Sequence, residues 1–194
     1  MKRFLKWTLA AVAAVVAAIA ASLFVKGDGF VFLAHRSEMK ALIAQADPQD
    51  RELSSPLREY LLFLFRGHPR YYATRLLADK FDPAAFGHGE MKWQFVYLVW
   101  SLATSVSFSD QDCLTVVALL TYTGGDNHGL NSAALAMFGH PLSELTPAEA
   151  ATLVVLVKGG AMYYNHPDRL AAERDRFMEM YKQHQKSSGS DSNG

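Results

Sequence analysis

Apolar residues recur at helical spacing along most of the chain, and no run alternates as a strand between hairpin turns would. The pattern predicts helices over residues 56–65 and 71–81. Ser55 before Pro56 marks the start of the first helix. Pro83 limits the second, because the residue before a proline resists helical backbone angles. These signals predict an all-α domain.

A third helix is expected over residues 90–106, where apolar side chains cover every face. A helix of this kind is either central in the core or in contact with lipid. We favour the core, because the segment is short for a membrane span and begins with a glutamate and a lysine. Its aromatic residues Trp93, Tyr97 and Trp100 are then core residues rather than contacts for a lipid tail.

Capping residues predict two further helices. Ser109, with Asp112 three residues later, starts a fourth helix that ends at Gly124 and Gly125, since glycine readily takes the left-handed conformation that terminates helices. A short fifth helix covers residues 132–138 and stops at the next glycine.

The C-terminal part of the chain contains two more expected helices. Thr146 caps the first, in which Pro147 is the first residue and Glu149 completes a capping box. This helix should run to Lys158 and stop at the two glycines that follow. A last amphipathic helix begins after Pro167.

The two ends of the chain differ from its helical middle. Three basic residues precede an uncharged run over residues 7–25, which as a helix would be about 28 Å long, close to the thickness of a bilayer's hydrocarbon core. We favour a transmembrane anchor over a cleaved secretory signal, because the apolar run continues past the small-x-small site at Ala18 and Ala20. The basic residues place the N-terminus in the cytoplasm and the rest of the chain across the membrane.

Three regions follow from these features. Residues 1–26 form a cytoplasmic basic stub and membrane anchor, and residues 27–186 form one folded helical domain. Residues 187–194 have no apolar side chain and are expected to be a disordered tail.

Charge and composition exclude some functions. The formal net charge is zero, which argues against a uniformly basic surface and against a nucleic-acid partner. The single cysteine, Cys113, cannot form an intramolecular disulfide, and its apolar neighbours predict a buried thiol. The seven histidines form no pair at metal-ligand spacing with a cysteine or carboxylate, so we expect no metal and no cofactor.

The most ordered motif of the sequence lies between residues 124 and 167. In chain order it contains Gly124, Gly129, Ala133, Ala134, Phe138, Gly139, Glu149, Asn165 and Pro167. This order resembles the peptidoglycan glycosyltransferases of family 51, the lipid II polymerases that also form the transglycosylase domains of penicillin-binding proteins. The resemblance covers roughly residues 108–181. It implies a lysozyme-like all-α fold, in which these motif residues are structural.

The chemistry of that family requires two glutamates, one as general base and one that helps to stabilise the departing lipid pyrophosphate. This chain contains no Glu-Asp dipeptide. Phe65 and His68 match half of the base motif, and in that register Leu61 and Leu62 stand at the Glu and Asp positions. Phe95 stands at the position of the second glutamate. The resemblance therefore implies a degenerate, non-catalytic member, a pseudoenzyme.

Three carboxylates could replace the missing base. A second register aligns residues 70–81 with the family's Ser-Thr-rich and Gln-rich stretch and leaves Glu38 as the nearest upstream carboxylate. Glu59 and Glu90 are the other two candidates. Beside Arg58 in the first turns of a helix, Glu59 is more simply a solvated residue that compensates the helix dipole.

Candidate substrate-binding residues come from two places. Lys92 stands at a family lysine. Asp126, Asn127 and His128 form a polar loop between two family glycines, which either faces a groove or is a plain turn.

Three hypotheses follow. The leading one is a membrane-anchored, transglycosylase-like protein of the bacterial inner membrane, with a periplasmic domain that binds lipid II, glycan or a protein of cell-wall synthesis without catalysis. The second is a divergent but active glycosyltransferase that polymerises lipid II and uses a divalent metal. The third is a structural remnant without sugar binding, whose groove is filled by Leu61, Leu62 and Phe95.

Overall fold

The computed structural model describes residues 12, 14–15, 18–19, 21–22, 24–25, 28–83, 89–125 and 127–190, with only the backbone described at 89–92 and 189–190. The expected cytoplasmic stub and most of the expected transmembrane anchor over residues 7–25 lie outside these residues, as does the end of the tail. Within the described part of the chain, no helix combines the length and the apolar character that a membrane span needs.

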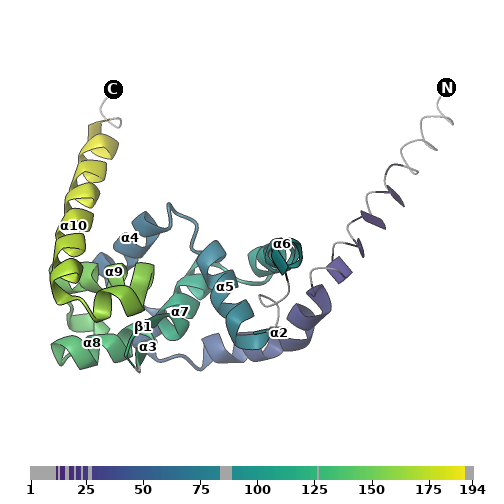
Figure 1. Ribbon diagram of the computed structural model, residues 1–194, viewed down its shortest axis with the longest axis horizontal. Coiled ribbons are helices and arrows are strands. Elements are labelled where there is room, and N and C mark those ends of the chain that lie inside the picture. The colour runs from purple at the N-terminus through teal and green to yellow at the C-terminus, as the bar shows by residue number, and fades with distance from the viewer. Residues whose placement is uncertain are drawn as a thin grey trace.

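The domain is built almost entirely of helices, as predicted (Figure 1). One small antiparallel hairpin interrupts them. The elements are α2 (Gly29–Ala44), α3 (Pro48–Arg51), α4 (Ser55–Leu64), α5 (Arg70–Phe81), α6 (Gly89–Ser107), α7 (Asp110–Leu120), β1 (Tyr122–Gly124), β2 (Asn127–His128), α8 (Leu130–Phe138), the 3-10 turn η1 (Leu142–Glu144), α9 (Pro147–Tyr164) and α10 (Pro167–Ser190).

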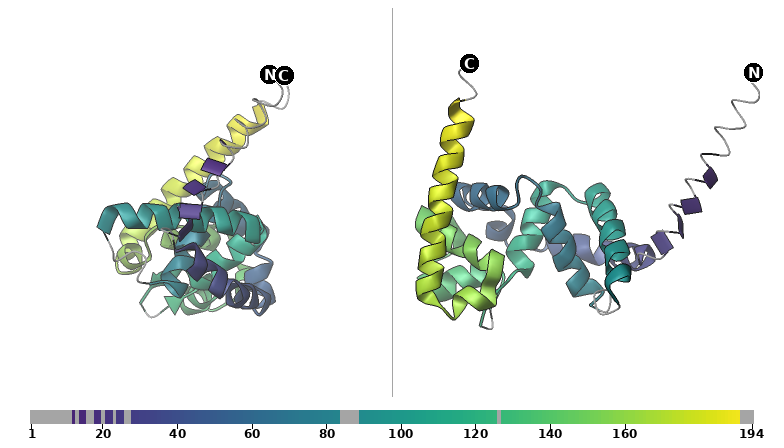
Figure 2. Two further views of the ribbon diagram at one scale, coloured as in Figure 1. Left: turned by 90° about the vertical axis from the view of Figure 1, so that its right-hand side faces the viewer. Right: turned by 45° about the horizontal axis from the view of Figure 1, so that its top comes forward.

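The helices are arranged along an elongated body with α6 and α10 at opposite ends (Figure 2). At one end α9 packs against α10, α4 and β1, and at the other α6 packs against α5 and α2. Helix α7 packs against α5 and joins the two ends. A single hydrophobic core runs through both, with Trp100, Leu114 and Leu153 fully buried.

Both predicted capping boxes are present. The Ser109 hydroxyl accepts a bond from the Asp112 amide at 3.1 Å, and the Asp112 carboxylate accepts one from the Ser109 amide at 2.8 Å. Thr146 and Glu149 repeat the arrangement at the start of α9. Each box satisfies two amides that the first helical turn leaves without a partner, so these helices begin where the sequence predicts.

The prediction for the end of α7 is wrong. The helix stops at Leu120, and the residues that follow form β1 rather than a last helical turn. Thr121 already has extended angles, and the β-branched and aromatic residues here favour a strand. Gly124 and Gly125, with φ of 107° and 60°, form the turn between β1 and β2 instead of a helix end.

The predicted end of α9 also needs correction. The helix is interrupted after Lys158 by Gly159, whose φ is −167° and ψ is 60°, but helical backbone resumes and continues to Tyr164. The interruption lets β1 cross close by, because a Cβ on Gly160 would lie 2.4 Å from the Tyr122 carbonyl oxygen. The two glycines therefore bend the helix rather than end it.

Other boundaries differ in smaller ways. Helices α2 and α3 lie in a region for which the sequence pattern predicts no helix. Ser54, one residue before the expected cap, is the N-cap of α4. Helix α10 runs to Ser190, beyond residue 186 at which the folded domain is expected to end.

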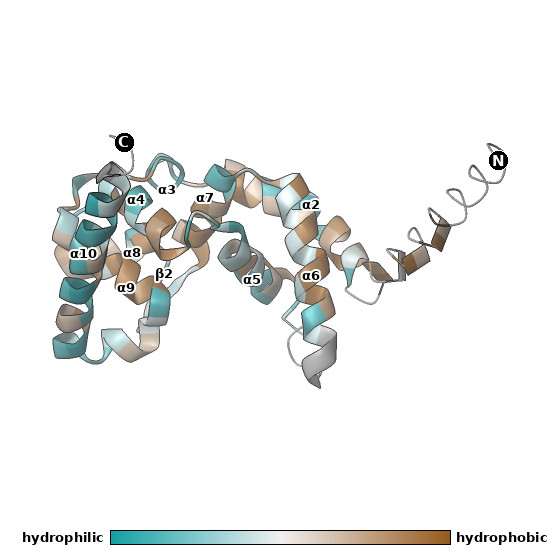
Figure 3. Ribbon diagram, turned by 90° about the horizontal axis from the view of Figure 1, so that it is seen from above, coloured by the Kyte–Doolittle hydropathy of each residue, from teal (hydrophilic) through white to brown (hydrophobic). Residues whose placement is uncertain are grey.

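Helix α6 is a core helix on one face only. Val96 and Trp100 are fully buried, whereas Leu98, Leu102 and Val106 are 47%, 61% and 86% exposed. Phe30 and Leu33 of α2 are also exposed large apolar residues, and Leu33, Leu98, Leu102 and Val106 line one apolar groove. We call these five exposed residues of α2 and α6 the apolar face; α6 is largely brown in Figure 3, whereas α10 at the other end is mostly teal.

Candidate functional site: a basic cleft between α5 and α9

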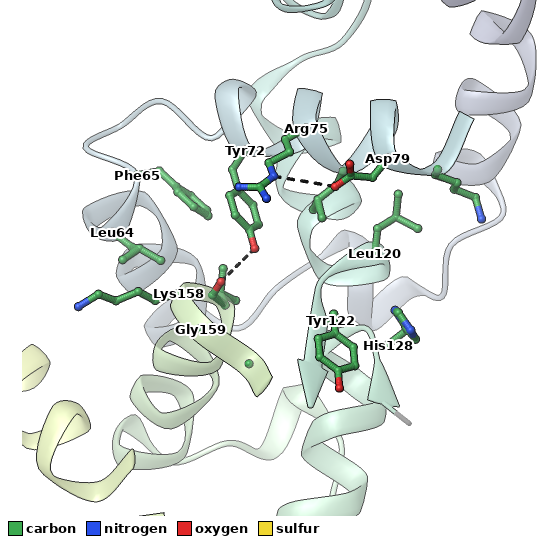
Figure 4. Close-up of a pocket in the computed structure, with 14 residues that line it drawn as sticks. Leu64, Phe65, Tyr72, Arg75, Asp79, Leu120, Tyr122, His128, Lys158 and Gly159 are labelled. Carbon is green, nitrogen blue, oxygen red and sulfur yellow. Dashed lines mark hydrogen bonds and ion pairs between the residues drawn. The ribbon is translucent and has the colours of Figure 1, made fainter. Parts of the chain in front are cut away.

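A cleft of about 800 Å³ opens between α5 on one side and α9 with the hairpin on the other (Figure 4). The end of α4 and the end of α7 complete its walls. Its volume lies in the range of pockets that hold drug-sized ligands. The lining residues are Leu64, Phe65, Tyr72, Arg75, Leu76, Asp79, Lys80, Leu120, Tyr122, His128, Val157, Lys158, Gly159 and Gly160.

Positive charge is in excess around this cleft. Arg75, Lys80 and Lys158 line it, and Lys158 Nζ lies 2.5 Å from a carboxylate oxygen of Glu173 on α10. Arg75 Nε is 3.9 Å from Asp79 Oδ2, a distance at the limit of an ion pair. Three cations and two carboxylates leave one positive charge before His128 is counted, so the cleft suits an anionic ligand.

Asp79 is the carboxylate of the cleft lining, and it was not among the residues singled out from the sequence. Burial raises the pKa of the Asp79 carboxyl, and the nearby Arg75 guanidinium partly opposes that rise. An acidic group whose pKa is raised in a cleft is a candidate for proton transfer.

Tyr72 fixes the width of the cleft by joining its two walls. Its hydroxyl donates a hydrogen bond of 2.9 Å to the Val157 carbonyl, next to the interruption at Gly159 (Figure 4). This hydrogen bond ties α5 to α9 two residues before the interruption. Burial raises the pKa of Tyr72, so the phenol keeps the proton that it donates.

The predicted substrate-binding residues are only partly brought together. His128 lines the cleft, and its ring lies 5.3 Å from that of Tyr122. Asn127 belongs to β2 and does not line the cleft, and its carbonyl accepts from Thr123 Oγ1 at 3.1 Å. Asp126 and the side chain of Lys92 lie outside the described residues.

Neither described glutamate candidate lines the cleft. Glu38 is on the exposed side of α2, 3.1 Å from His35 Nδ1. Glu59 on α4 accepts bonds of 2.7 Å from Ser55 and from Tyr181, and these bonds lower the pKa of its carboxyl. The side chain of Glu90 lies outside the described residues. The geometry therefore gives no support to Glu38 or Glu59 as a base in this cleft.

The cleft is not filled by the residues that stand at the family's acidic positions. Leu61 is fully buried in the core, and Leu62 faces a different hollow beside α10. Phe95 does not line the cleft either. Phe65, the family's phenylalanine in the first register, does line it, with its ring stacked on Tyr72 at 5.2 Å.

The residues present do not form a divalent-metal site. Among the described residues, no group of three histidine, cysteine or acidic side chains is close enough to hold a metal ion. Asp79 and His128 are the metal-ligand types in the lining, and they stand among cations that would repel a metal. We therefore derive no step through a metal.

The cleft residues that the sequence reasoning missed share one periodicity. Counted from Tyr72, the other four residues lie three, four, seven and eight positions further along α5. This spacing places all five on one side of the helix: Tyr72, Arg75, Leu76, Asp79 and Lys80. A polar stripe of this kind on a helix otherwise packed in the core was the signal that could have found them.

The residues of the motif between 124 and 167 lie in turns, at helix ends and in helix packing. Ala133 and Ala134 are buried where α8 packs, and Gly139 ends that helix with left-handed angles. Gly124 lies against the Tyr164 ring, so that a Cβ there would be 2.2 Å from the tyrosine Cβ. The others are Gly129 before α8, Phe138 stacked on His140, Glu149 in its capping box, Asn165 at the end of α9 and Pro167 at the start of α10.

Comparison with known protein families finds a match for part of the chain. Residues 90–182, just under half of the chain, match the transglycosylase family. The match contains the whole stretch 108–181 on which the resemblance rests, and it includes the wall of the cleft formed by the hairpin and α9. A search among curated proteins finds no match.

One wall of the cleft therefore lies within the transglycosylase match, and the other lies outside it. The wall from α4 and α5, which carries Tyr72, Arg75, Asp79 and Lys80, precedes residue 90 and lies outside the match. The transglycosylase-like half supplies His128 and Lys158.

Proposed function

We propose that the protein is a membrane-anchored, peptidoglycan glycosyltransferase-like protein of cell-wall biogenesis with a lysozyme-like fold. Its cleft binds lipid II, or the glycan made from it, without polymerising it. The transglycosylase match supports the class of protein, and the charge of the cleft supports an anionic, pyrophosphate-bearing ligand.

The observation that carries the proposal is that the described lining of the cleft contains basic side chains but no glutamate. Arg75, Lys80 and Lys158 are the groups a pyrophosphate would need, whereas no glutamate is among the described lining residues. Such a cleft lacks the two glutamates that glycosyl transfer would use, but it can bind a pyrophosphate-bearing ligand.

The membrane placement is supported by the apolar face. Monomeric soluble proteins rarely expose contiguous large apolar patches. The face lies on α2 and α6, and α2 begins at Gly29, shortly after the uncharged run over residues 7–25 in the sequence. We propose a single-pass protein of the bacterial inner membrane, with a periplasmic domain that rests on the bilayer through this face, close to a lipid-linked substrate or a membrane-bound partner of cell-wall synthesis.

A second function is favoured by Asp79. A carboxyl group with a raised pKa inside the cleft could accept the proton of an attacking sugar hydroxyl. In this alternative the protein is a divergent, active lipid II polymerase whose base is an aspartate on α5 rather than Glu38, Glu59 or Glu90.

The test is lipid II binding and lipid II polymerisation measured side by side on the detergent-solubilised full-length protein. We expect binding without polymer. Lys158→Ala and Arg75→Ala should each weaken binding about tenfold, whereas Arg169→Ala at the start of α10, which removes the same charge outside the cleft lining, should not.

Two other results would each support a different hypothesis. Glycan polymer that disappears in Asp79→Asn supports the active enzyme. Absence of both binding and polymer overturns both functions and leaves a structural remnant or a protein-binding scaffold.

A further inference from the structure

A second hollow, of about 900 Å³, lies on the other side of the turn that follows α4. It is bounded by the end of α4, by the turn, and by the C-terminal half of α10. Its lining residues are Glu59, Leu62, Phe63, Arg66, Gly67, Tyr181, His184, Gln185 and Ser188. We call it the α10 hollow.

Aromatic rings form one wall of the α10 hollow. The Phe63 ring lies 5.3 Å from that of Tyr181 and 5.1 Å from that of His184. Tyr60 and Phe177 support them from the core side, at 4.7 Å from Tyr181 and 5.6 Å from Phe63. The rings are thus held in place by other rings and form a rigid apolar surface.

Polar groups of both kinds surround this wall. Glu59 is held by Ser55 and Tyr181, and because those hydrogen bonds lower the pKa of its carboxyl, it remains an ionised acceptor at neutral pH. Gln185 adds an amide that can both donate and accept. The hollow therefore offers hydrogen-bond partners for hydroxyl groups beside an apolar surface.

Arg66 is the unusual residue of the site. Its φ of 52° places it in the left-handed region, which costs free energy for a residue with a Cβ. Within the described part of the chain its guanidinium has no ion-pair partner, and it stands exposed at the mouth of the hollow. The left-handed angles close the end of α4, where the Arg66 amide donates to the Phe63 carbonyl at 3.1 Å and the Gly67 amide to the Leu62 carbonyl at 2.8 Å, and the same turn presents a cation with five donors at the hollow.

We propose that the α10 hollow is a saccharide-binding site, separate from the cleft. Sugar rings present C–H groups that pack on aromatic faces and hydroxyls that pair with Arg, Glu and Gln side chains. A groove for a partner helix would instead present an aliphatic stripe. The chain has such a stripe on α2 and α6, where Leu98, Leu102 and Val106 are exposed, and not here.

The two sites are connected along the surface. A smaller hollow of about 320 Å³ between them is lined by Leu64 and Lys158, which also line the cleft, and by Phe63 and Arg66, which also line the α10 hollow. A linear saccharide can therefore extend from the cleft past Arg66 to the aromatic wall. This proposal rests on the proposed function only for the expectation that sugars are present; the site itself requires no pyrophosphate.

The test uses a β-1,4-linked tetrasaccharide of N-acetylglucosamine, which has neither a pyrophosphate nor a lipid. Titrated into the isotope-labelled full-length protein in detergent, it should shift backbone amide signals of α4, the 65–68 turn and residues 177–188. Arg66→Gly should weaken binding about tenfold without loss of folding, because glycine relieves the left-handed strain. Tyr181→Phe, which keeps the ring, should weaken binding about threefold, and Arg169→Ala should have no effect.

The outcomes separate this site from the cleft. If the tetrasaccharide shifts no signal on α4 or α10 up to about 10 mM, the proposal is overturned and the hollow is left as a protein-binding surface. Binding that Arg66→Gly leaves unchanged overturns it equally. Loss of lipid II binding in Lys158→Ala with intact tetrasaccharide binding supports two sites, and lipid II binding without any tetrasaccharide binding keeps the proposed function alone.

Discussion

Asp50 is a carboxyl group in an unfavourable position. It is 7% exposed, one of its carboxylate oxygens has no hydrogen-bond partner, and Gln49 and Ser54 beside it also have buried acceptors without partners. Burial raises the pKa of the Asp50 carboxyl, and the charge of Asp47 raises it further. Ionised Asp50 therefore opposes folding, although α3 is held in place by α7 and α8.

The sign of the pH effect follows from that raised pKa. A group whose pKa is higher in the folded state than in the unfolded state stabilises the fold below its unfolded pKa, and the stabilisation is lost as the pH rises through the folded pKa. We expect Asp50→Asn to raise the free energy of unfolding by about 1 kcal/mol at pH 7 and to have no such benefit near pH 3. Urea unfolding at the two pH values measures this, and equal effects at both would contradict it.

Tyr72 makes a second prediction at the level of one residue. Its hydroxyl donates to the Val157 carbonyl, so Tyr72→Phe removes a part-buried hydrogen bond between α5 and α9. We expect a loss of about 1–2 kcal/mol in the free energy of unfolding. Tyr71→Phe is the matched control, because Tyr71 is 59% exposed and should change stability by less than about 0.5 kcal/mol. Equal losses in both variants would show that the bond across the cleft contributes nothing.

Single residues show where sequence reasoning stops. Cys113 was predicted to be a buried thiol, and it is 1% exposed with a pKa raised to about 12 by burial. That prediction needed only its apolar neighbours. The roles of Asp79 and Arg66 depend on which helices face them across a space. The spacing on α5 marks one side of that helix, but it does not say that a cleft lies there.

At the scale of elements, the two helix starts that have a capping box were predicted to the residue. Ser109 and Thr146 each satisfy amides of their own helix, so the signal and its effect are both local. Helix α2 has no such signal at its start, because its N-cap, Asp28, has left-handed angles and makes no side-chain cap hydrogen bond. The hairpin was missed because β1 and β2 together contain five residues, too few for an alternating pattern.

The crossing of α9 and β1 gives a prediction at this scale. A Cβ on Gly160 would meet the Tyr122 carbonyl oxygen at 2.4 Å, and backbone on both sides prevents a small adjustment. We expect Gly160→Ala to lower the free energy of unfolding by about 3 kcal/mol. Gly67→Ala is the comparison, because Gly67 has open space and a φ of 77°, so the strain alone should cost about 1 kcal/mol.

Thermal or urea unfolding measures the free energy of unfolding of the two glycine variants. A Gly160→Ala protein as stable as Gly67→Ala would mean that α9 and β1 separate easily, and that the wall of the cleft on that side is soft.

At the scale of the whole molecule, polar and apolar surfaces lie at opposite ends. The apolar face is on α2 and α6, and the polar helix α10 stands at the other end (Figures 1 and 3). On the membrane placement proposed above, this distribution would put α6 at the lipid and direct α10 away from it.

Polarity-sensitive dyes test this orientation. Because Cys113 is buried and keeps its proton, a cysteine introduced at the surface is the reactive one. In nanodiscs, a dye attached to Leu102→Cys should show emission shifted to the blue, as in an apolar environment. The same dye on Arg169→Cys of α10 should show the emission of water. Identical spectra from the two positions would remove the support that the apolar face gives to membrane contact.

The short turn after α4 has one more consequence. Leu64 and Phe65 face the cleft, while Leu62, Phe63 and Arg66 face the α10 hollow, so one thin partition bounds two cavities. The same segment also borders the smaller hollow between them. A shift of this segment toward the cleft would narrow the space beside Tyr72 and widen the space beside Tyr181, so a single short turn bears on both sites.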